Sequence, residues 1–234
     1  MGLFLSGLQK RISKAELFKE SASKQEDLGQ IALDQYGNTY RYVQLKNAIG
    51  ARGKLVITTK TAEATLASST DLLEVTQAAA GWTANQYAGH SLFIDDGTGE
   101  GQVRRIKSNT ETVLTLEQAL TTALSVADSD GTVFSENHVN ISAITATIQA
   151  VQGVSVMAHT DEYYGWIQIG GVAEVLVGAA VATDTYITPG DDTTGQGKVV
   201  GGGATIDTVT LVGRTEVANS NADTGIPTKL LLGY

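Results

Sequence analysis

The sequence predicts a mainly β protein, made of small barrel or sandwich modules and preceded by a short helical N-terminal arm. From residue 30 onward, short runs of β-branched and aromatic residues alternate with clusters of Gly, Asp and Asn, which is the pattern of strands joined by turns. In the last third these runs recur about every 10–15 residues, a spacing typical of small barrels and sandwiches rather than of βαβ units. Glycine is abundant, at 26 residues, and charged residues make up only 18% of the chain, which fits closely packed, turn-rich β-structure.

Residues 1–27 are expected to form an amphipathic arm, with a helix over residues 3–20. The apolar positions of this helix recur at intervals of three and four, and they are Leu5, Leu8, Ile12, Ala15 and Phe18. Such a helix is marginal alone and must lay its apolar stripe on another surface. That surface is either the helix's own domain or a neighbouring subunit. Residues 21–29 have the composition of a polar linker.

A β domain is expected over residues 28–137. It begins with a hairpin, because an alternating run after residue 30 is followed by a "YGN" turn and a second run with Tyr40, Tyr42 and Val43. The run "GKLVITT" at 53–59 predicts a further strand. The Ala- and Thr-rich residues 61–80 fit either a short helix or a loop.

Residues 82–137 are expected to form a hairpin module within this domain. Its four predicted strands are "HSLFID", "GQVRRIKS", "VLTLEQ" and "GTVFSE". A barrel-like C-terminal domain is expected over residues 138–234, where the predicted strands are "VNISAITATIQAV", "YGWIQIGGVAEVLV", "TDTYITP", "GKVVGG", "DTVTLVGRTEV" and "TKLLLGY".

The stretch "DDGTGEGQVRRI", residues 95–106, is the closest approach to a ligand-binding loop. A phosphate loop needs GxxxxGK[ST], but Gln102 lies five residues after Gly97 and no GK pair follows. The glycines are also misplaced for GxGxxG, and a strand-like run follows where a helix should begin. Neither this loop nor residues 128–136 has the ligand order of an EF-hand. We therefore predict a tight hairpin, with Arg104 and Arg105 on opposite faces.

The remaining polar residues do not form a recognisable catalytic or metal motif. His90, His138 and His159 are far apart and lack HxxxH or HExxH spacing. The segment "HTD" at 159–161 is expected to be a solvated loop. There is no GxSxG motif and no cysteine, so neither a hydrolase elbow nor a thiolate site is supported. We expect no catalytic residue, no metal and no cofactor.

An aromatic cluster stands out in "EYYGWIQIGG". Tyr163, Tyr164 and Trp166 lie at the start of a predicted strand, and such clusters either stack sugars, anchor an interface or fill a core. Core packing is the commonest of these roles.

The formal net charge of −9 is unevenly distributed. Up to Lys24 there are five basic residues and two acidic ones, which gives +3, so the rest of the chain carries −12. An acidic body repels nucleic acid, so no nucleic-acid partner is expected. No apolar run reaches 18 residues, so no membrane partner is expected either.

The segments "LGQIALDQYGNTYRYVQLKNA", "GKLV", "YGWIQIGGVAEVLVGAAVATDTYITP" and "LVGRTEVA…TKLLLGY" resemble virion structural proteins of tailed bacteriophages, and in particular head decoration (cement) proteins. The stretch "GHSLFIDDGTGEGQVRRIKSNTETVLTLEQAL" is similar to a β-module of phage head and tail proteins. The resemblance spans most of residues 28–234 and consists of turns and strands.

The resemblance implies a non-enzymatic capsid decoration protein. Such a protein binds the major capsid protein lattice, associates as a homotrimer, stabilises the head, and is found on the capsid surface of the virion after synthesis in the bacterial cytoplasm. The residues expected to contact partners are an apolar anchor (Leu5, Leu8, Ile12 and Phe18), basic residues that pair with an acidic shell (Lys10, Arg11 and Lys14) and the aromatic cluster (Tyr163, Tyr164 and Trp166).

Two other functions are compatible with the sequence. One is another virion component, such as a head–tail or tail subunit or part of a host-binding fibre. The other is a carbohydrate-binding or carbohydrate-active protein, which would depend on the aromatic cluster and on the Asp- and Glu-containing loops.

Overall fold

β-branched and aromatic residues that alternate along the chain form strands throughout the computed structural model. It describes residues 10–63, 65–140, 151–184, 186–189, 196–199, 213–216, 218 and 224–232. The predicted mainly β class is confirmed, and a small closed barrel is present. Among the residues that the structure describes, no helix is long and apolar enough to cross a membrane.

Two compact units divide the chain, and one of them is inserted into the other. Unit 1 comprises Met1–Thr58 and Glu136–Tyr234, and unit 2 comprises Thr59–Ser135. The division crosses β4 (Leu55–Glu63) and β10 (Asp130–Asn140). It differs from the contiguous domains at 28–137 and 138–234 expected above. A linear pattern of strands and turns does not mark an insertion that leaves on one strand and returns on another.

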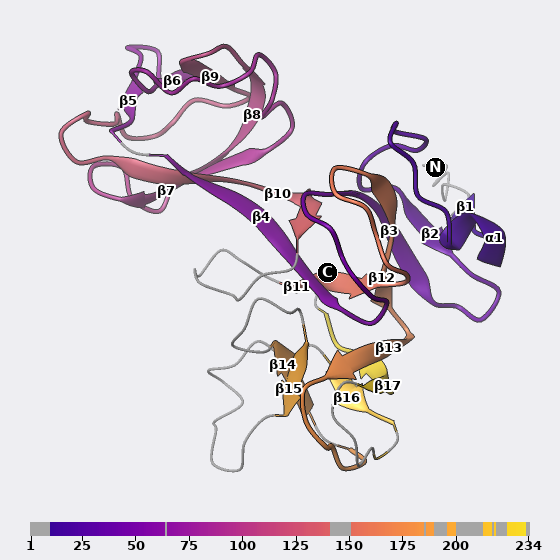
Figure 1. Cartoon of the computed structure of the whole chain (residues 1–234). Coiled ribbons are helices and arrows are strands. Elements are labelled where there is room, and N and C mark those ends of the chain that lie inside the picture. The colour runs from indigo at the N-terminus through magenta and orange to yellow at the C-terminus, as the bar shows by residue number, and fades with distance from the viewer. Residues whose placement is uncertain are drawn as a thin grey trace, which may run out of the picture. The chain divides into compact units, whose positions relative to one another are not determined.

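The main sheet of unit 1 has the strand order β1-β2-β3-β12-β11-β4 (Figure 1). Its remaining strands are β1 (Lys10–Arg11), β2 (Ile31–Leu33), β3 (Thr39–Leu45), β12 (Tyr164–Gly170) and β11 (Val151–Ser155). The edge strand β1 pairs in parallel with β2, whereas the other neighbours in this order are antiparallel. The hairpin predicted after residue 30 is therefore confirmed as β2 and β3.

Both faces of this sheet are buried where β3 and β12 pair. Because successive side chains of a strand point to opposite faces, Tyr40 and Tyr42 pack on one face with Trp166. Val43 and Leu45 pack on the other face with Ile167 and Ile169. Strands covered on both sides contain near-continuous apolar residues, which explains the runs "YRYVQL" and "WIQI".

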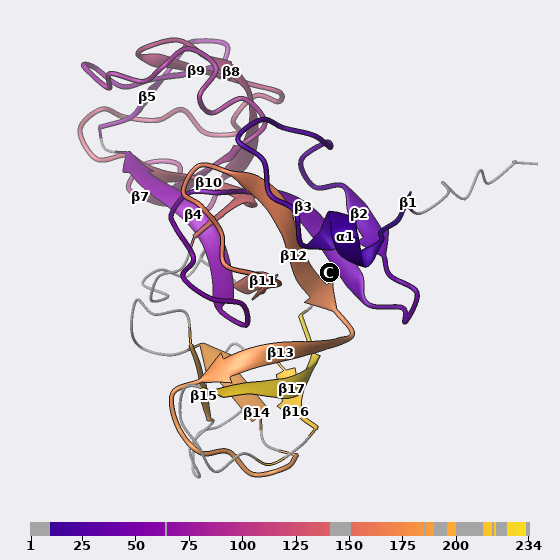
Figure 2. The same ribbon diagram turned by 45° about the vertical axis from the view of Figure 1, so that its right-hand side comes forward.

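Five strands of unit 1 close into the small barrel, in the order β13-β15-β14-β16-β17. They are β13 (Val172–Val177), β14 (Tyr186–Pro189), β15 (Gly197–Val199), β16 (Gly213–Thr215) and β17 (Thr224–Leu230). Figure 2 shows β13 and β17 side by side, paired antiparallel along their length. Val175, Ile187 and Ile226 are buried inside, as the alternating valine-rich run predicts.

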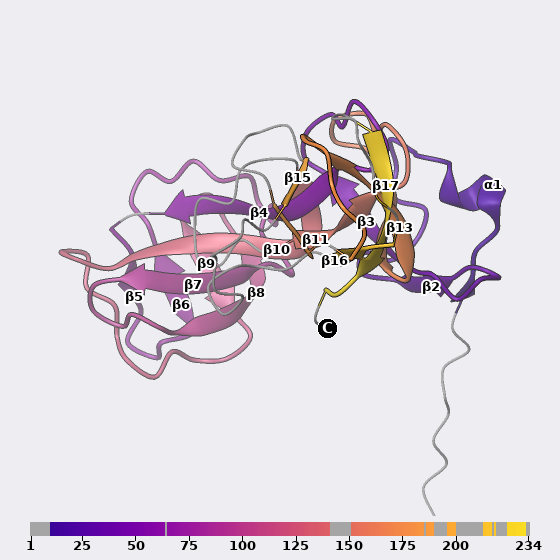
Figure 3. The same ribbon diagram turned by 90° about the horizontal axis from the view of Figure 1, so that it is seen from below.

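Unit 2 is an antiparallel sheet with the order β10-β7-β8-β9-β6-β5. Its other strands are β5 (Ala67–Ser68), β6 (Glu74–Thr76), β7 (Ser91–Asp96), β8 (Val103–Asn109) and β9 (Val113–Leu116). Figure 3 shows β10 beside β7, its antiparallel partner. The ambiguous residues 61–80 thus contribute short strands, and no helix is present in the part of them that is described.

The predicted helix over residues 3–20 is wrong in its extent. Residues 3–9 lie outside the described part of the chain, β1 occupies Lys10–Arg11, and α1 covers only Lys14–Leu17. Ser13 starts α1 through a capping box: its hydroxyl accepts from the backbone N–H of Glu16, whose carboxylate accepts from the backbone N–H of Ser13. Ile12 and Leu17 are buried against Ala32 and the aromatic face of the sheet. The apolar spacing thus reflects burial of the arm on its own unit, through a strand and one helical turn.

The Asp34 carboxylate organises the turn between β2 and β3. Its Oδ1 accepts hydrogen bonds from the backbone N–H groups of Tyr36 and Asn38, at 2.8 and 2.9 Å. Its Oδ2 accepts from the Asn38 amide and the Tyr40 hydroxyl, at 2.8 and 3.1 Å. Burial opposes ionisation, but these hydrogen bonds outweigh it and lower the pKa of Asp34.

The stretch at residues 95–106 forms the predicted hairpin between β7 and β8. Gly97, Gly99 and Gly101 have φ of 75°, 94° and 87°, a region that glycine occupies without strain. A Cβ atom at Gly97 would overlap the backbone carbonyl of Asp128, whereas a Cβ at Gly101 would meet nothing within 4 Å. The tight approach of two loops therefore requires glycine at Gly97.

This difference makes a matched pair of variants. We expect Gly101→Ala to cost unit 2 about 1–2 kcal/mol of unfolding free energy, because Ala is strained at positive φ. Gly97→Ala should cost about 2 kcal/mol more, because Asp128 must also move. Denaturant unfolding monitored by Trp82 fluorescence in a Trp166→Phe background measures both, and equal losses would contradict the close approach.

Candidate functional site

The N-terminal residues of the described chain are fixed to unit 1 at several points. The backbone N–H of Ile12 donates to the carbonyl of Leu33 at 2.9 Å, and Ser21 exchanges backbone hydrogen bonds with Tyr164. The Glu20 carboxylate accepts from the backbone N–H and hydroxyl of Thr160, at 2.8 and 2.6 Å. Of the two surfaces that the arm was expected to cover, its own domain is the one that residues 10–27 pack on.

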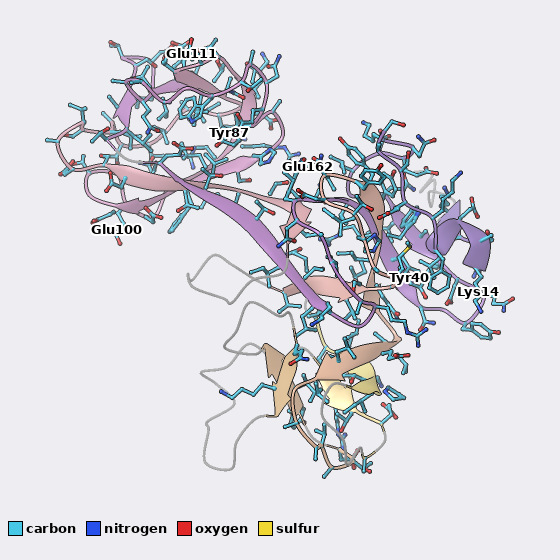
Figure 4. All side chains as sticks on the ribbon, in the orientation of Figure 1. Lys14, Tyr40, Tyr87, Glu100, Glu111 and Glu162 are labelled. Atoms are coloured by element: carbon cyan, nitrogen blue, oxygen red, sulfur yellow. The ribbon has the colours of Figure 1, made fainter. Side chains whose placement is uncertain are left out.

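A pocket of about 480 Å³ lies between α1 and the β2–β3 turn. We call it the α1 pocket, and it is lined by Ile12, Ser13, Lys14, Leu17, Phe18, Asp34, Gln35, Tyr36 and Tyr40. Two of its aromatic residues are unusually exposed, since Phe18 is 40% and Tyr36 81% accessible. Figure 4 shows the Lys14 and Tyr40 side chains at this part of unit 1.

The exposed apolar surface continues beyond the α1 pocket. A second pocket, of about 210 Å³, shares Leu17, Phe18 and Tyr40 with it and reaches Val172 at the start of β13. Val172 is 48% accessible. Large apolar side chains that gather at the surface around a hollow are typical of protein-binding sites.

A third pocket, of about 220 Å³, contains most of the aromatic cluster predicted from sequence. Trp166 meets Tyr42 edge to face at 5.2 Å between ring centroids, and Tyr42 stacks on Tyr164 at 6.4 Å. Lys10 forms an ion pair with Glu26 and places its ammonium 5.5 Å from the Trp166 ring centroid. The Trp166 residue is only 3% accessible, so its ring has almost no surface on which a sugar could stack.

Tyr163 differs from its two aromatic neighbours in the sequence. It precedes β12 and is half-buried, and its carbonyl accepts from the backbone N–H of Leu45 at 2.8 Å. The pocket that holds Tyr164 and Trp166 does not include it. The structure therefore brings Lys10, Tyr164 and Trp166 together, and brings Ile12, Lys14 and Phe18 together in the α1 pocket. Leu5 and Leu8 lie outside the described residues.

Several basic side chains of the N-terminal segment face solvent. Arg11, Lys14, Lys19 and Lys24 are all exposed. Arg11 donates to the backbone carbonyl of Asp34 at 3.0 Å, and Lys24 pairs with Asp27 at 3.5 Å. We call residues 10–24 the basic segment, because their five cations and two carboxylates give +3 on a chain of net charge −9.

The carboxylates in the acidic loops of unit 2 accept hydrogen bonds from residues of the same unit and so stabilise these loops. Asp95 accepts from the Thr132 hydroxyl at 2.6 Å, Asp96 from the backbone N–H of Gly97 at 2.8 Å, and Asp128 from the Thr98 hydroxyl at 2.9 Å. Within the described ranges, no three His, Cys, Asp or Glu residues come together as metal ligands. Arg104 donates to the Ala119 carbonyl at 2.7 Å, whereas Arg105 pairs with Glu117 at 3.6 Å.

The expectation of a solvated loop at residues 159–161 is wrong for His159. The His159 side chain is fully buried, and its Nδ1 lies 3.4 Å from the Glu20 carboxylate. Burial lowers the pKa of His159, and the Glu20 carboxylate offsets only part of this effect. This burial has no signal in the local sequence, because the partner carboxylate is 139 residues away along the chain.

Glu63 is a buried carboxylate that the sequence analysis missed. Its Oε1 accepts hydrogen bonds from the Trp82 indole N–H and the Tyr87 hydroxyl, both at 3.2 Å. Burial raises the pKa of Glu63 in spite of these hydrogen bonds. Perturbed carboxylates are common at functional sites, but these two donors belong to the apolar core of unit 2, so the contacts indicate a structural role.

No protein-family model, curated protein or solved structure matches this chain. The candidate site therefore stands on the geometry of the described residues: the α1 pocket with its exposed aromatic rim, beside a basic segment.

The burial of His159 makes unit 1 sensitive to acid. Its folded pKa is lowered, so the unfolded chain binds more protons as pH falls below about 6.5, and stability must fall with pH in that range. We expect His159→Leu to flatten this slope. Unfolding monitored by Trp166 fluorescence in a Trp82→Phe background tests it. His90→Leu removes a histidine of unit 2 and is the matched control, because Trp166 fluorescence reports on unit 1.

Glu63 gives unit 2 the opposite response. Its folded pKa is raised, so native unit 2 binds more protons and gains stability as pH falls from neutrality toward the unfolded value. Glu63→Gln should abolish this gain and match or exceed the wild type at pH 7. Glu63→Ala should cost about 2–4 kcal/mol, because two buried donors lose their acceptor. A Gln variant as unstable as the Ala variant would show that the negative charge itself is needed.

Proposed function

We propose that this chain is a structural protein of the tailed-phage head, a capsid decoration (cement) protein that binds the major capsid protein, self-associates as a trimer and stabilises the shell. The proposal is supported by the sequence resemblance to decoration proteins and by the exposed side chains of unit 1. Its place would be the capsid surface of the virion, and its role would be binding rather than catalysis.

The observation that carries this proposal is the exposed basic segment next to exposed aromatic side chains. Arg11, Lys14 and Lys19 project from a chain that is otherwise acidic, so they favour an acidic protein surface as partner. Phe18 and Tyr36 add apolar area for self-association at the same end of the sheet. A capsid lattice repeats the same contact many times by symmetry. Each contact can therefore be weak while their sum stabilises the shell.

The remaining strong polar groups also support a binding role. The carboxylates of Asp34, Glu20 and Glu63 are each satisfied by hydrogen bonds inside their own unit. Asp34 and Glu20 stabilise the framework of unit 1 that presents the surface, and Glu63 stabilises the core of unit 2.

The proposal is tested with heads assembled from the major capsid protein in the absence of this chain. We expect the purified protein to co-sediment with these heads and raise their resistance to heat. Arg11→Glu combined with Lys19→Glu should weaken binding by about tenfold or more at low salt, because each reversed contact turns a favourable pair into a repulsive one. The loss should shrink in high salt.

A control variant sharpens the result. Lys107→Glu reverses one charge at an exposed position of unit 2 and should bind like the wild type. Absence of binding to heads, or equal binding by all variants, would refute the proposed site.

A further inference from the structure

We infer that the α1 pocket is the docking site for the apolar segment that precedes β1, residues 1–9, of a second copy of this chain. The inference deepens the proposed function by naming the surfaces through which copies join. It rests on the proposed function only for the number of copies in the oligomer, which is three. The exchange of the segment itself requires no capsid.

The chemistry of the segment matches that of the pocket. Residues 1–9, "MGLFLSGLQ", contain four large apolar side chains besides Met1 and no charged side chain: Leu3, Phe4, Leu5 and Leu8. The pocket offers apolar walls from Ile12, Leu17, Phe18, Tyr36 and Tyr40. Its volume, about 480 Å³, lies within the range of sites that enclose small ligands, about 300–1,000 Å³. Burial of apolar surface on both sides favours the association.

The direction of β1 favours a second copy over the same chain. β1 runs parallel to β2, with Lys10 opposite Ala32 and Arg11 opposite Leu33. The pocket is formed by residues 12–18 and 34–36, which follow these two strands at their C-terminal ends. Residues 1–9 join β1 at its other end. A chain would have to reverse its direction to fill its own pocket, whereas a neighbour's segment can enter without this reversal.

The segment that is inserted and the pocket that receives it lie at opposite ends of β1, so the interface between two copies is head-to-tail. Such interfaces close into rings when the rotation between copies allows it. Nine extended residues span at most about 30 Å, so the pocket of the neighbour must lie within that distance of Lys10. A cyclic trimer on a threefold site of a lattice satisfies both conditions.

Light scattering of the purified full-length protein, coupled to gel filtration and without any capsid, tests the exchange. We expect a trimer for the wild type and monomers for two variants. One lacks residues 1–9 and keeps the pocket; the other carries Phe18→Glu and Tyr36→Glu and keeps the segment. Val126→Glu, at an exposed position of unit 2, is the matched control and should remain trimeric. Unchanged unfolding curves, monitored by intrinsic fluorescence, exclude a folding defect.

Mixing the two monomeric variants gives the decisive result. The intact segment of one should enter the intact pocket of the other, and growth must then stop at a one-to-one heterodimer. A mixture that stays monomeric, a wild type that is monomeric, or a trimeric deletion variant would each overturn the inference.

A labelled peptide of residues 1–9 distinguishes exchange from occupancy by the same chain. We expect it to bind the deletion variant and to bind a deletion variant with Phe18→Glu and Tyr36→Glu at least about tenfold more weakly. Peptide binding combined with a monomeric wild type would mean that each chain fills its own pocket, and would overturn the exchange. Trimers that fail to bind heads would refute the proposed function while leaving this inference intact.

Discussion

A single carboxylate, that of Asp34, holds together the part of unit 1 on which the candidate site depends. It receives four hydrogen bonds, from two backbone N–H groups, one amide and one phenol. The turn that it closes places Tyr36 in solvent and Tyr40 in the sheet. Arg11 is tied to the Asp34 carbonyl, so the edge strand is fixed to the same turn. Truncation of the Asp34 side chain would leave several donors without an acceptor at once.

The same turn also reaches the barrel. The Asn38 side chain, oriented by Asp34, accepts a hydrogen bond from the backbone N–H of Val172 at 3.2 Å. Gly171, with φ of 84°, lies directly against Asn38 and lets the chain change direction into β13. The arm, the sheet and the barrel therefore meet at one small group of residues. A surface built at this junction has a fixed shape, which reduces the entropy lost when a partner binds.

Local patterns predicted most strands and the hairpin at residues 95–106, because the alternation of side chains and the glycines of a turn are encoded within a few residues. The extent of the N-terminal helix was not predictable from the same signal, since Ile12 and Leu17 have helical spacing yet reach the core from a strand and one turn. The burial of His159 beside Glu20 and the insertion of unit 2 depend on contacts between distant parts of the chain. Of the residues that line the α1 pocket, the sequence predicted Ile12, Lys14 and Phe18 as partner contacts, whereas the places of Asp34 and Tyr36 depend on the turn.

The insertion of unit 2 has a consequence for how this protein can be modified. The segment leaves on β4 and returns on β10, which are neighbours in the strand order, and adjacent strands lie only about 5 Å apart. The two ends of the inserted segment therefore lie on adjacent strands of one sheet, an arrangement suited to the insertion of a domain whose ends are close together. A foreign domain could then be inserted in unit 1 between Thr58 and Glu136, in place of unit 2.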